Sequence, residues 1–205
     1  MNYAAVMASV VTRDSVRAQT LASLFAEGIA PEVFISPETE AYRKARIEEI
    51  RRNVHRAFSY GVQQHASYVL YLEDDIIAAP GLSMMIDGAI QQNVHAFTPY
   101  LPGTKSHRPD PVPQGLFPIK QLSSWVGAQC LLMRADVVRM MLGGGPPQCA
   151  DMWLRDILLR NRWALHSCHP NRVQHREGPS SWLGKGRRHS SGTFSDASTQ
   201  QGLFT

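Results

Sequence analysis

The sequence predicts an α/β protein in which a mostly parallel central sheet is flanked by helices within a single domain. Short apolar segments alternate along the chain with amphipathic segments of helical periodicity. The apolar segments are hydrophobic at nearly every position, which is typical of parallel strands that are covered on both faces. The 205 residues include 43% hydrophobic and 19% charged residues, which suits one domain with a sizeable core.

The alternation of strands and helices continues along the chain to about Pro170. The first half is expected to contain strands 3–11, 31–36 and 68–76 and helices 14–27 and 40–65. The second half is expected to contain helix 81–91, strands 94–100, 125–134 and 163–168, and helices 135–142 and 149–162. Segment 101–124 is rich in proline and lacks periodicity, so it is expected to form a flap over a functional site.

Two helices of the first half have predicted packing faces. Helix 14–27 can begin at Asp14 or Ser15 and can stop at Gly28. Its packed face is expected to consist of Ala18, Leu21, Ala22 and Phe25. Helix 40–65 is expected to pack through Ile47, Ile50, Val54, Ala57, Phe58 and Gly61.

Three consecutive carboxylates, Glu73, Asp74 and Asp75, directly follow the apolar part of strand 68–76. Desolvation and like-charge repulsion make such a cluster costly unless a cation compensates it. Ligands of parallel sheets bind at the carboxyl ends of the strands, where these acids are expected to lie. A divalent cation, Mn²⁺ or Mg²⁺, is therefore predicted there, because both prefer oxygen ligands. The alternative is a solvated acidic turn that pairs with arginines of the preceding helix.

The sequence resembles the GT-A glycosyltransferases, nucleotide-sugar enzymes with a Rossmann-like α/β sheet. The motif that carries the resemblance is Glu73-Asp74-Asp75, which is similar to the Asp-x-Asp motif of that family. Three further segments are similar to family segments: TRDSVRAQTLASL, NVHRAFSYG and, in the manner of type IV N-acetylglucosaminyltransferases, VQHREGPSSWLGKGRRHSSGTF. The resemblance covers most of the chain in its order of elements.

The resemblance implies a role for individual residues. Asp75 and His175 would bind the metal, and Asp151 would be the general base. Trp125 and Gly127 would lie on the acceptor side. The nucleotide-sugar would be bound by Thr12, Arg13, Asn53, Arg56, Glu73, Asp74 and Lys185. In domain terms, residues 1–80 would bind the donor, residues 81–170 the acceptor, and the tail 171–205 would complete the site.

The activity implied is transfer of a sugar from a UDP-sugar, or another nucleotide-sugar, to an acceptor hydroxyl with inversion. The acceptor is expected to be either a saccharide or a hydroxymethylated pyrimidine in DNA, as in bacteriophages that glycosylate their genome. The basic run KGRRH, within a chain of formal charge +4, would suit a phosphate-bearing ligand. A metal-dependent nucleotidyltransferase or phosphohydrolase, and a non-catalytic nucleic-acid-binding module, are the alternatives.

The remaining sequence features concern compartment and a second metal. Three widely spaced cysteines, no signal peptide and no membrane span predict a cytoplasmic, reducing environment. A zinc site made of His166, Cys168, His169 and His175 is disfavoured, because the spacing matches no common zinc pattern.

Overall fold

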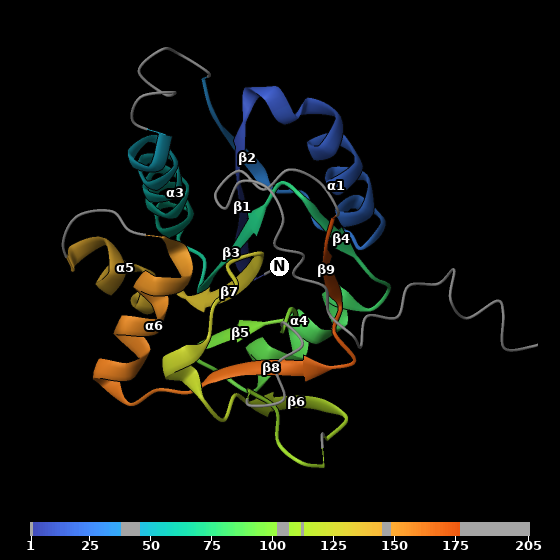
Figure 1. Cartoon of the computed structure of the whole chain (residues 1–205), viewed down its shortest axis with the longest axis vertical. Coiled ribbons are helices and arrows are strands. Elements are labelled where there is room, and N and C mark those ends of the chain that lie inside the picture. The colour runs from blue at the N-terminus through green and yellow to red at the C-terminus, as the bar shows by residue number, and fades with distance from the viewer. Residues whose placement is uncertain (1, 38–45, 102–106, 112, 145–148, 177–205) are drawn as a thin grey trace, which may run out of the picture.

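The computed structural model of the 205-residue chain describes residues 2–37, 46–101, 107–111, 113–144 and 149–176. A seven-stranded sheet crosses the centre of the molecule, with helices on both of its faces (Figure 1). The strands, in spatial order, are β2 (Glu32–Ser36), β1 (Tyr3–Val10), β3 (Tyr68–Glu73), β7 (Cys130–Arg134), β5 (Ala96–Thr98), β8 (Leu165–His169) and β6 (Gly115–Pro118).

The sheet is mixed, although most of its strands share one direction. Strand β1 pairs in parallel with β2 and β3, and β5 pairs in parallel with β8. Strand β7 lies between β3 and β5 and is antiparallel to both, and β6 is antiparallel to β8 at the edge. The carboxyl end of β3 therefore lies beside the amino end of β7.

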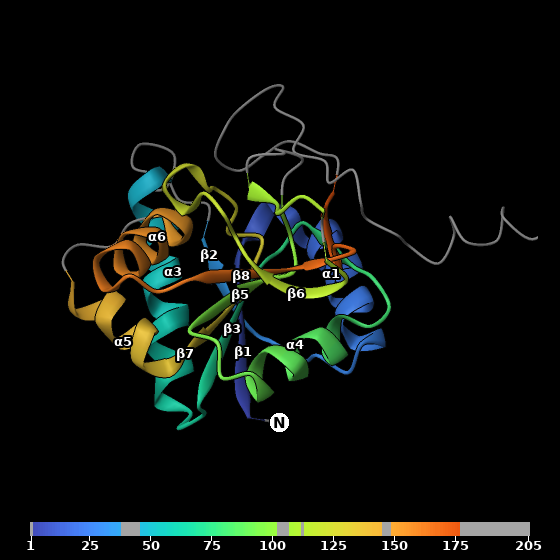
Figure 2. The same ribbon diagram turned by 90° about the horizontal axis from the view of Figure 1, so that it is seen from below.

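Helices α3 (Arg46–Gln63), α5 (Ala135–Gly143) and α6 (Ala150–Asn161) cover one face of the sheet, and α1 (Asp14–Ala26) and α4 (Leu82–Gln91) cover the other (Figures 1 and 2). Each face has its own core, with Phe58 and Trp153 in the first and Leu24 and Ile86 in the second. Both cores rest on strand β3, which is buried from Tyr68 to Leu72 and whose successive residues Val69 and Leu70 belong to different cores.

A second, two-stranded sheet lies next to the end of β3. It pairs β4 (Ile76–Ala78) with β9 (Val173–His175) in antiparallel register, with Ile76 opposite His175. Two short 3-10 turns, η1 (Val11–Arg13) and η3 (Leu122–Ser124), complete the described elements. Among the described residues, no helix combines the length and hydrophobicity that a bilayer crossing requires.

The predicted α/β fold class is confirmed, and so is the packed face of α3 as far as its side chains are described. The predicted face of α1 is wrong except at Leu21, which packs partly buried against the second core, while Ala18, Ala22 and Phe25 are exposed. Phe25 is 56% exposed, whereas Thr20 and Leu24 are fully buried. Because this short helix has small alanines on both sides, its sequence does not decide which side faces the sheet. Tertiary packing places Thr20 and Leu24 on the buried side.

The second half of the chain departs from expectation in three places. Residues Gly115–Pro118, expected within the flap, form the edge strand β6, while residues 102–106 and 112 of that segment lie outside the described residues. The strand expected from Trp125 begins only at Cys130. Residues Val173–His175, expected in a surface tail, form β9, because their backbone groups pair with β4.

Helix α3 packs so closely on β3 at Gly61 that a larger residue there is expected to destabilise the protein. A Cβ added at Gly61 of α3 would lie 2.7 Å from Cγ1 of the buried Val69, whereas one at Gly88 of α4 would lie 3.9 Å from Leu116 Cδ1. We expect Gly61→Ala to lower the free energy of unfolding by about 1–3 kcal/mol through overpacking. Gly88→Ala should instead raise it by up to about 1 kcal/mol, because alanine favours helix. Urea denaturation of both variants is the measurement, and a stabilised Gly61→Ala would contradict the packing.

Candidate functional site

The acidic turn between β3 and β4 is held from two sides. The hydroxyl of Thr20, which is fully buried on α1, lies 2.9 Å from the carbonyl oxygens of both Asp74 and Ile76. From the other side, the backbone N–H of Arg176 donates to the carbonyl oxygen of Asp75 over 2.7 Å. These bonds satisfy buried backbone carbonyls and fix the direction in which the three acidic side chains leave the turn.

Arg13, in the turn between β1 and α1, compensates two of the three carboxylates. Its guanidinium lies 2.7 Å from Asp74 Oδ1 and 2.6 Å from Asp75 Oδ2. The Ser9 hydroxyl donates to Asp74 Oδ2 over 2.6 Å, and Arg17 donates to Ser9 Oγ over 2.8 Å. Burial still outweighs these partners for Asp74, so its pKa is raised above the ordinary value.

His175 approaches Asp75 from β9, with Nε2 3.1 Å from Oδ2. Burial alone would raise the pKa of Asp75, but the hydrogen bond from His175 and the charge of Arg13 outweigh it and lower that pKa. The same hydrogen bond raises the pKa of His175. The second oxygen, Asp75 Oδ1, is buried and has no hydrogen-bond partner among the described residues. It is therefore an acceptor with unused lone pairs.

Glu73 points into the same region, and among the residues that the structure describes its carboxylate forms no ion pair. Burial raises the pKa of its carboxyl well above the ordinary value, and the neighbouring charges of Asp75 and Asp151 raise it further. One ligand atom each from Glu73, Asp75 and His175 can be chosen so that all three lie within 4.8 Å of one another. Two carboxylates and an imidazole at this spacing can hold a divalent cation.

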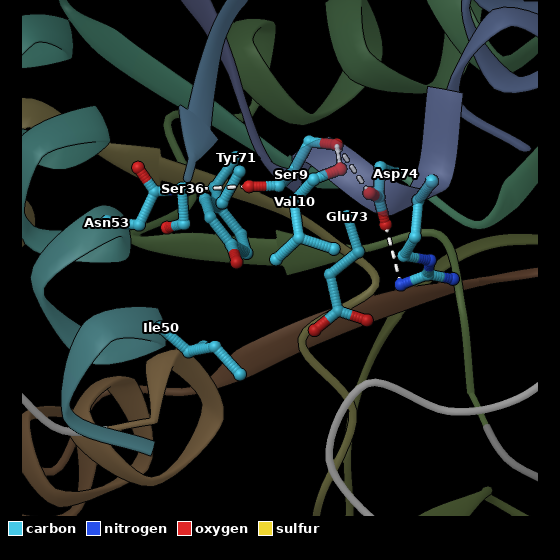
Figure 3. A pocket seen from close by; sticks show the side chains of 10 residues that line it. Ser9, Val10, Ser36, Ile50, Asn53, Tyr71, Glu73 and Asp74 are labelled. Carbon is cyan, nitrogen blue, oxygen red and sulfur yellow. Dashed lines mark hydrogen bonds and ion pairs between the residues drawn. The ribbon is translucent and has the colours of Figure 1, made fainter. Parts of the chain in front are cut away.

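A cavity of about 40 Å³ lies beside the acids, between the ends of β1, β2 and β3 and helix α3. Figure 3 shows Ile50 and Asn53 on one side of it and Asp74 on the other, with Tyr71 and Glu73 between them. Asn53 is anchored by donating to the carbonyl oxygens of Ser9 and Phe34. The hydroxyl of Ser36 lines the same cavity, is buried, and has no hydrogen-bond partner among the described residues.

Asp151 borders the acids from α6, in the first turn of that helix. Its Oδ2 accepts from the backbone N–H of Gly127 over 3.2 Å, and its Oδ1 accepts from its neighbour's N–H over 2.8 Å. Gly127 has a φ of 140°, a conformation that favours glycine. Trp125 is fully buried, so its indole packs beneath this region instead of lining it.

The structure brings most of the predicted site residues together. Arg13, Asn53 and the acids lie around the cavity and the metal-ligand cluster, which consists of Glu73, Asp75 and His175. Asp151 and Gly127 lie next to them. Thr12 is exposed beside them, and neither Thr12 nor Arg56 lines the cavity. Arg56 instead donates to Asn53 Oδ1 over 2.7 Å. Lys185 lies outside the described residues.

Sequence reasoning missed several polar residues that shape the site: Ser9, Arg17, Thr20, Ser36, Tyr71 and Gln129. Ser9 is the one that left a signal, as a hydroxyl residue within an otherwise apolar strand. Among the described residues, the metal-ligand cluster contains His175 together with Glu73 and Asp75, and it includes neither His166, Cys168 nor His169.

No known protein-family profile matches the chain, and no curated protein matches it in sequence. Solved structures match its fold. A197 from STIV aligns with a TM-score of 0.52 at 8% identity, covering 88% of this chain and 88% of that one. A mutant of Drosophila β-1,4-galactosyltransferase 7, in complex with manganese, UDP-Gal and xylobiose, aligns with a TM-score of 0.51 at 13% identity, covering 93% and 83%. At these identities the similarity shows a shared fold, and the predicted GT-A type of α/β sheet is thereby confirmed.

The Asp75–His175 contact predicts how stability depends on pH. Because the pKa of His175 is raised above its usual 6.5, the stabilisation from this pair is complete below that pH and is lost as pH rises through the folded pKa. We expect the melting temperature of chelator-treated protein to fall over this window, and to fall less in His175→Gln. Ionisation of Glu73 also lowers stability as pH rises, but both proteins keep that contribution. The exposed His65→Gln should behave as wild type, and identical curves for His175→Gln and wild type would refute the assignment.

Proposed function

We propose that the protein is a metal-dependent glycosyltransferase that moves a sugar from a nucleotide-sugar, with UDP favoured, to an acceptor hydroxyl. The observation that carries the proposal is the cluster of Glu73, Asp75 and His175 beside a cavity at the carboxyl ends of β1, β2 and β3. The unused Asp75 Oδ1 supports a metal ligand at this point. An imidazole among the ligands favours Mn²⁺ over Mg²⁺, which prefers oxygen ligands throughout.

The charges of the site support a diphosphate leaving group. A divalent cation at the cluster would act as a Lewis acid and stabilise the negative charge that develops on the diphosphate. Asn53 and Ser36 line the cavity next to the acids and would hold the nucleotide. The Arg13 guanidinium contacts both Asp74 and Asp75 and favours the ionised form of each carboxyl. In this proposal, residues 1–80 would supply most of the donor site, since all ten residues that line the cavity belong to them.

Asp151 is the best-placed general base. Its carboxylate lies on the α6 side of the acids, and both of its oxygens keep lone pairs beyond the backbone bonds that they accept. It would remove the proton from the acceptor hydroxyl as that oxygen attacks the sugar. A single displacement of this kind inverts the configuration of the anomeric carbon.

A saccharide is the favoured acceptor, supported by the xylobiose in the galactosyltransferase complex of the same fold. A hydroxymethylated pyrimidine in DNA is the other acceptor to be tested. In this proposal, Asp151 of α6 and His175 of β9 would complete the site with either acceptor.

Calorimetric titration of UDP tests the donor site. We expect wild type to bind UDP only in the presence of Mn²⁺, and Asp75→Asn to weaken this binding by at least about tenfold, because it removes a charged metal ligand. Asp87→Asn, an exposed acid on α4, is the matched control and should bind as wild type. Mn²⁺ binding without any affinity for UDP or another nucleoside diphosphate would favour a hydrolase instead.

Asp151→Asn tests the base. Transfer should fall by about 10²–10⁴-fold while the affinity for UDP and Mn²⁺ stays at the wild-type value. UDP release is measured with xylobiose, other disaccharides and hydroxymethylcytosine DNA as acceptors. Asp156→Asn on the same helix is the control, because among the described residues the carboxylate of Asp156 has a single ion-pair contact, at 3.9 Å from Arg155. Loss of UDP affinity in Asp151→Asn would assign the residue to donor binding.

A further inference from the structure

Gln129 lies at the amino end of β7, directly opposite Glu73 of β3. The N–H of Glu73 donates to the carbonyl oxygen of Gln129 over 3.0 Å, one step beyond the pair Leu72–Cys130. Residues that oppose each other in an antiparallel pair project their side chains from the same face of the sheet. The amide of Gln129 therefore leaves the sheet beside the carboxylate of Glu73.

The side-chain oxygen of Gln129 has no hydrogen-bond partner in the described part of the chain. Oε1 is buried and accepts no hydrogen bond from the described residues, although the residue as a whole is partly exposed. It lies so close to Gly127 that a Cβ added there would be 3.1 Å away. Leaving a buried amide oxygen unpaired costs free energy, which an apolar side chain of the same size would avoid. A ligand that donates a hydrogen bond would remove this cost.

The position of Gln129 indicates which part of a ligand reaches it. The sheet begins with the strand order β2-β1-β3-β7. The cavity lies at the ends of the first three of these strands, and the metal-ligand cluster lies at the end of β3. Gln129 directly precedes β7, and the backbone N–H of Gly127, two residues earlier, donates to Asp151. A nucleotide-sugar bound along the carboxyl ends of β2, β1 and β3 and past the amino end of β7 would have its base in the cavity, its diphosphate at the metal-ligand cluster and its sugar over Gln129.

We propose that Gln129 selects the donor sugar by accepting a hydrogen bond from one of its hydroxyl or amide N–H groups. This inference rests on the proposed function and adds a specificity-determining residue to it. The carboxamide also has two N–H donors, so it can satisfy a hydroxyl as both donor and acceptor. Sites built to hydrogen-bond a particular substituent reject analogues that lack it or direct it elsewhere, because a buried polar group is then left unpaired.

The test compares UDP with UDP-sugars on the Mn²⁺-loaded protein. UDP, UDP-glucose, UDP-galactose and UDP-N-acetylglucosamine are titrated into wild type, Gln129→Met and Gln121→Met. The last variant is the control, because Gln121 is an exposed glutamine of the same connection between β6 and β7. We expect wild type to prefer one sugar by at least about tenfold and Gln129→Met to lose that preference. The affinity of Gln129→Met for UDP should stay within about twofold of wild type, and Gln121→Met should match wild type throughout.

Three results would overturn the inference while leaving the proposed function intact. They are a wild type without preference among the sugars, a preference that survives in Gln129→Met, and an equal loss of affinity for UDP and UDP-sugars in that variant. If Gln129→Met does not melt cooperatively, Gln129→Asn, which withdraws the amide by one methylene group, replaces it with the same expectations. Failure of wild type to bind UDP or any other nucleoside diphosphate would instead overturn the proposed function, and this inference with it.

Discussion

The contact of Arg13 with Asp74 and Asp75 is the interaction on which the architecture of the site depends. Two buried carboxylates at the end of a core strand would repel each other and lose hydration, and a guanidinium that bridges both provides the compensation. The contact also ties the turn after β1 to the turn after β3. The two parallel strands are thereby joined at their carboxyl ends as well as along their ladder.

The described residues compensate the three acids incompletely. Glu73 keeps a strongly raised pKa, and Asp75 keeps an unused oxygen, even though Arg13 and His175 both contact that residue. A divalent cation would satisfy both groups at once. Because a ligand that binds only the folded state stabilises it, the same residues would link metal binding to the stability of the β3–β4 turn.

The general fold and the acidic centre could be predicted from sequence, because both rest on local patterns. Apolar runs, helical periodicity and three acids in a row are visible without knowing what packs against them. The packed face of α1 could not be predicted, because Ala18 and Ala22 are compatible with either side of the helix. The short strands β6 and β9 could not be predicted either, because a strand of three or four residues is defined by its partner more than by its own sequence.

By itself, then, the sequence determined the helices and the longer strands of the described chain and which strand carries the carboxylates. The tertiary structure decided that the guanidinium of Arg13 pairs with those carboxylates. It also decided that His175 reaches Asp75 from β9 and that Gln129 lies opposite Glu73. The physical reason is that these contacts depend on strand order, direction and register. Those properties arise from long-range pairing, and a shift of register by one residue would turn each of these side chains to the other face of its sheet.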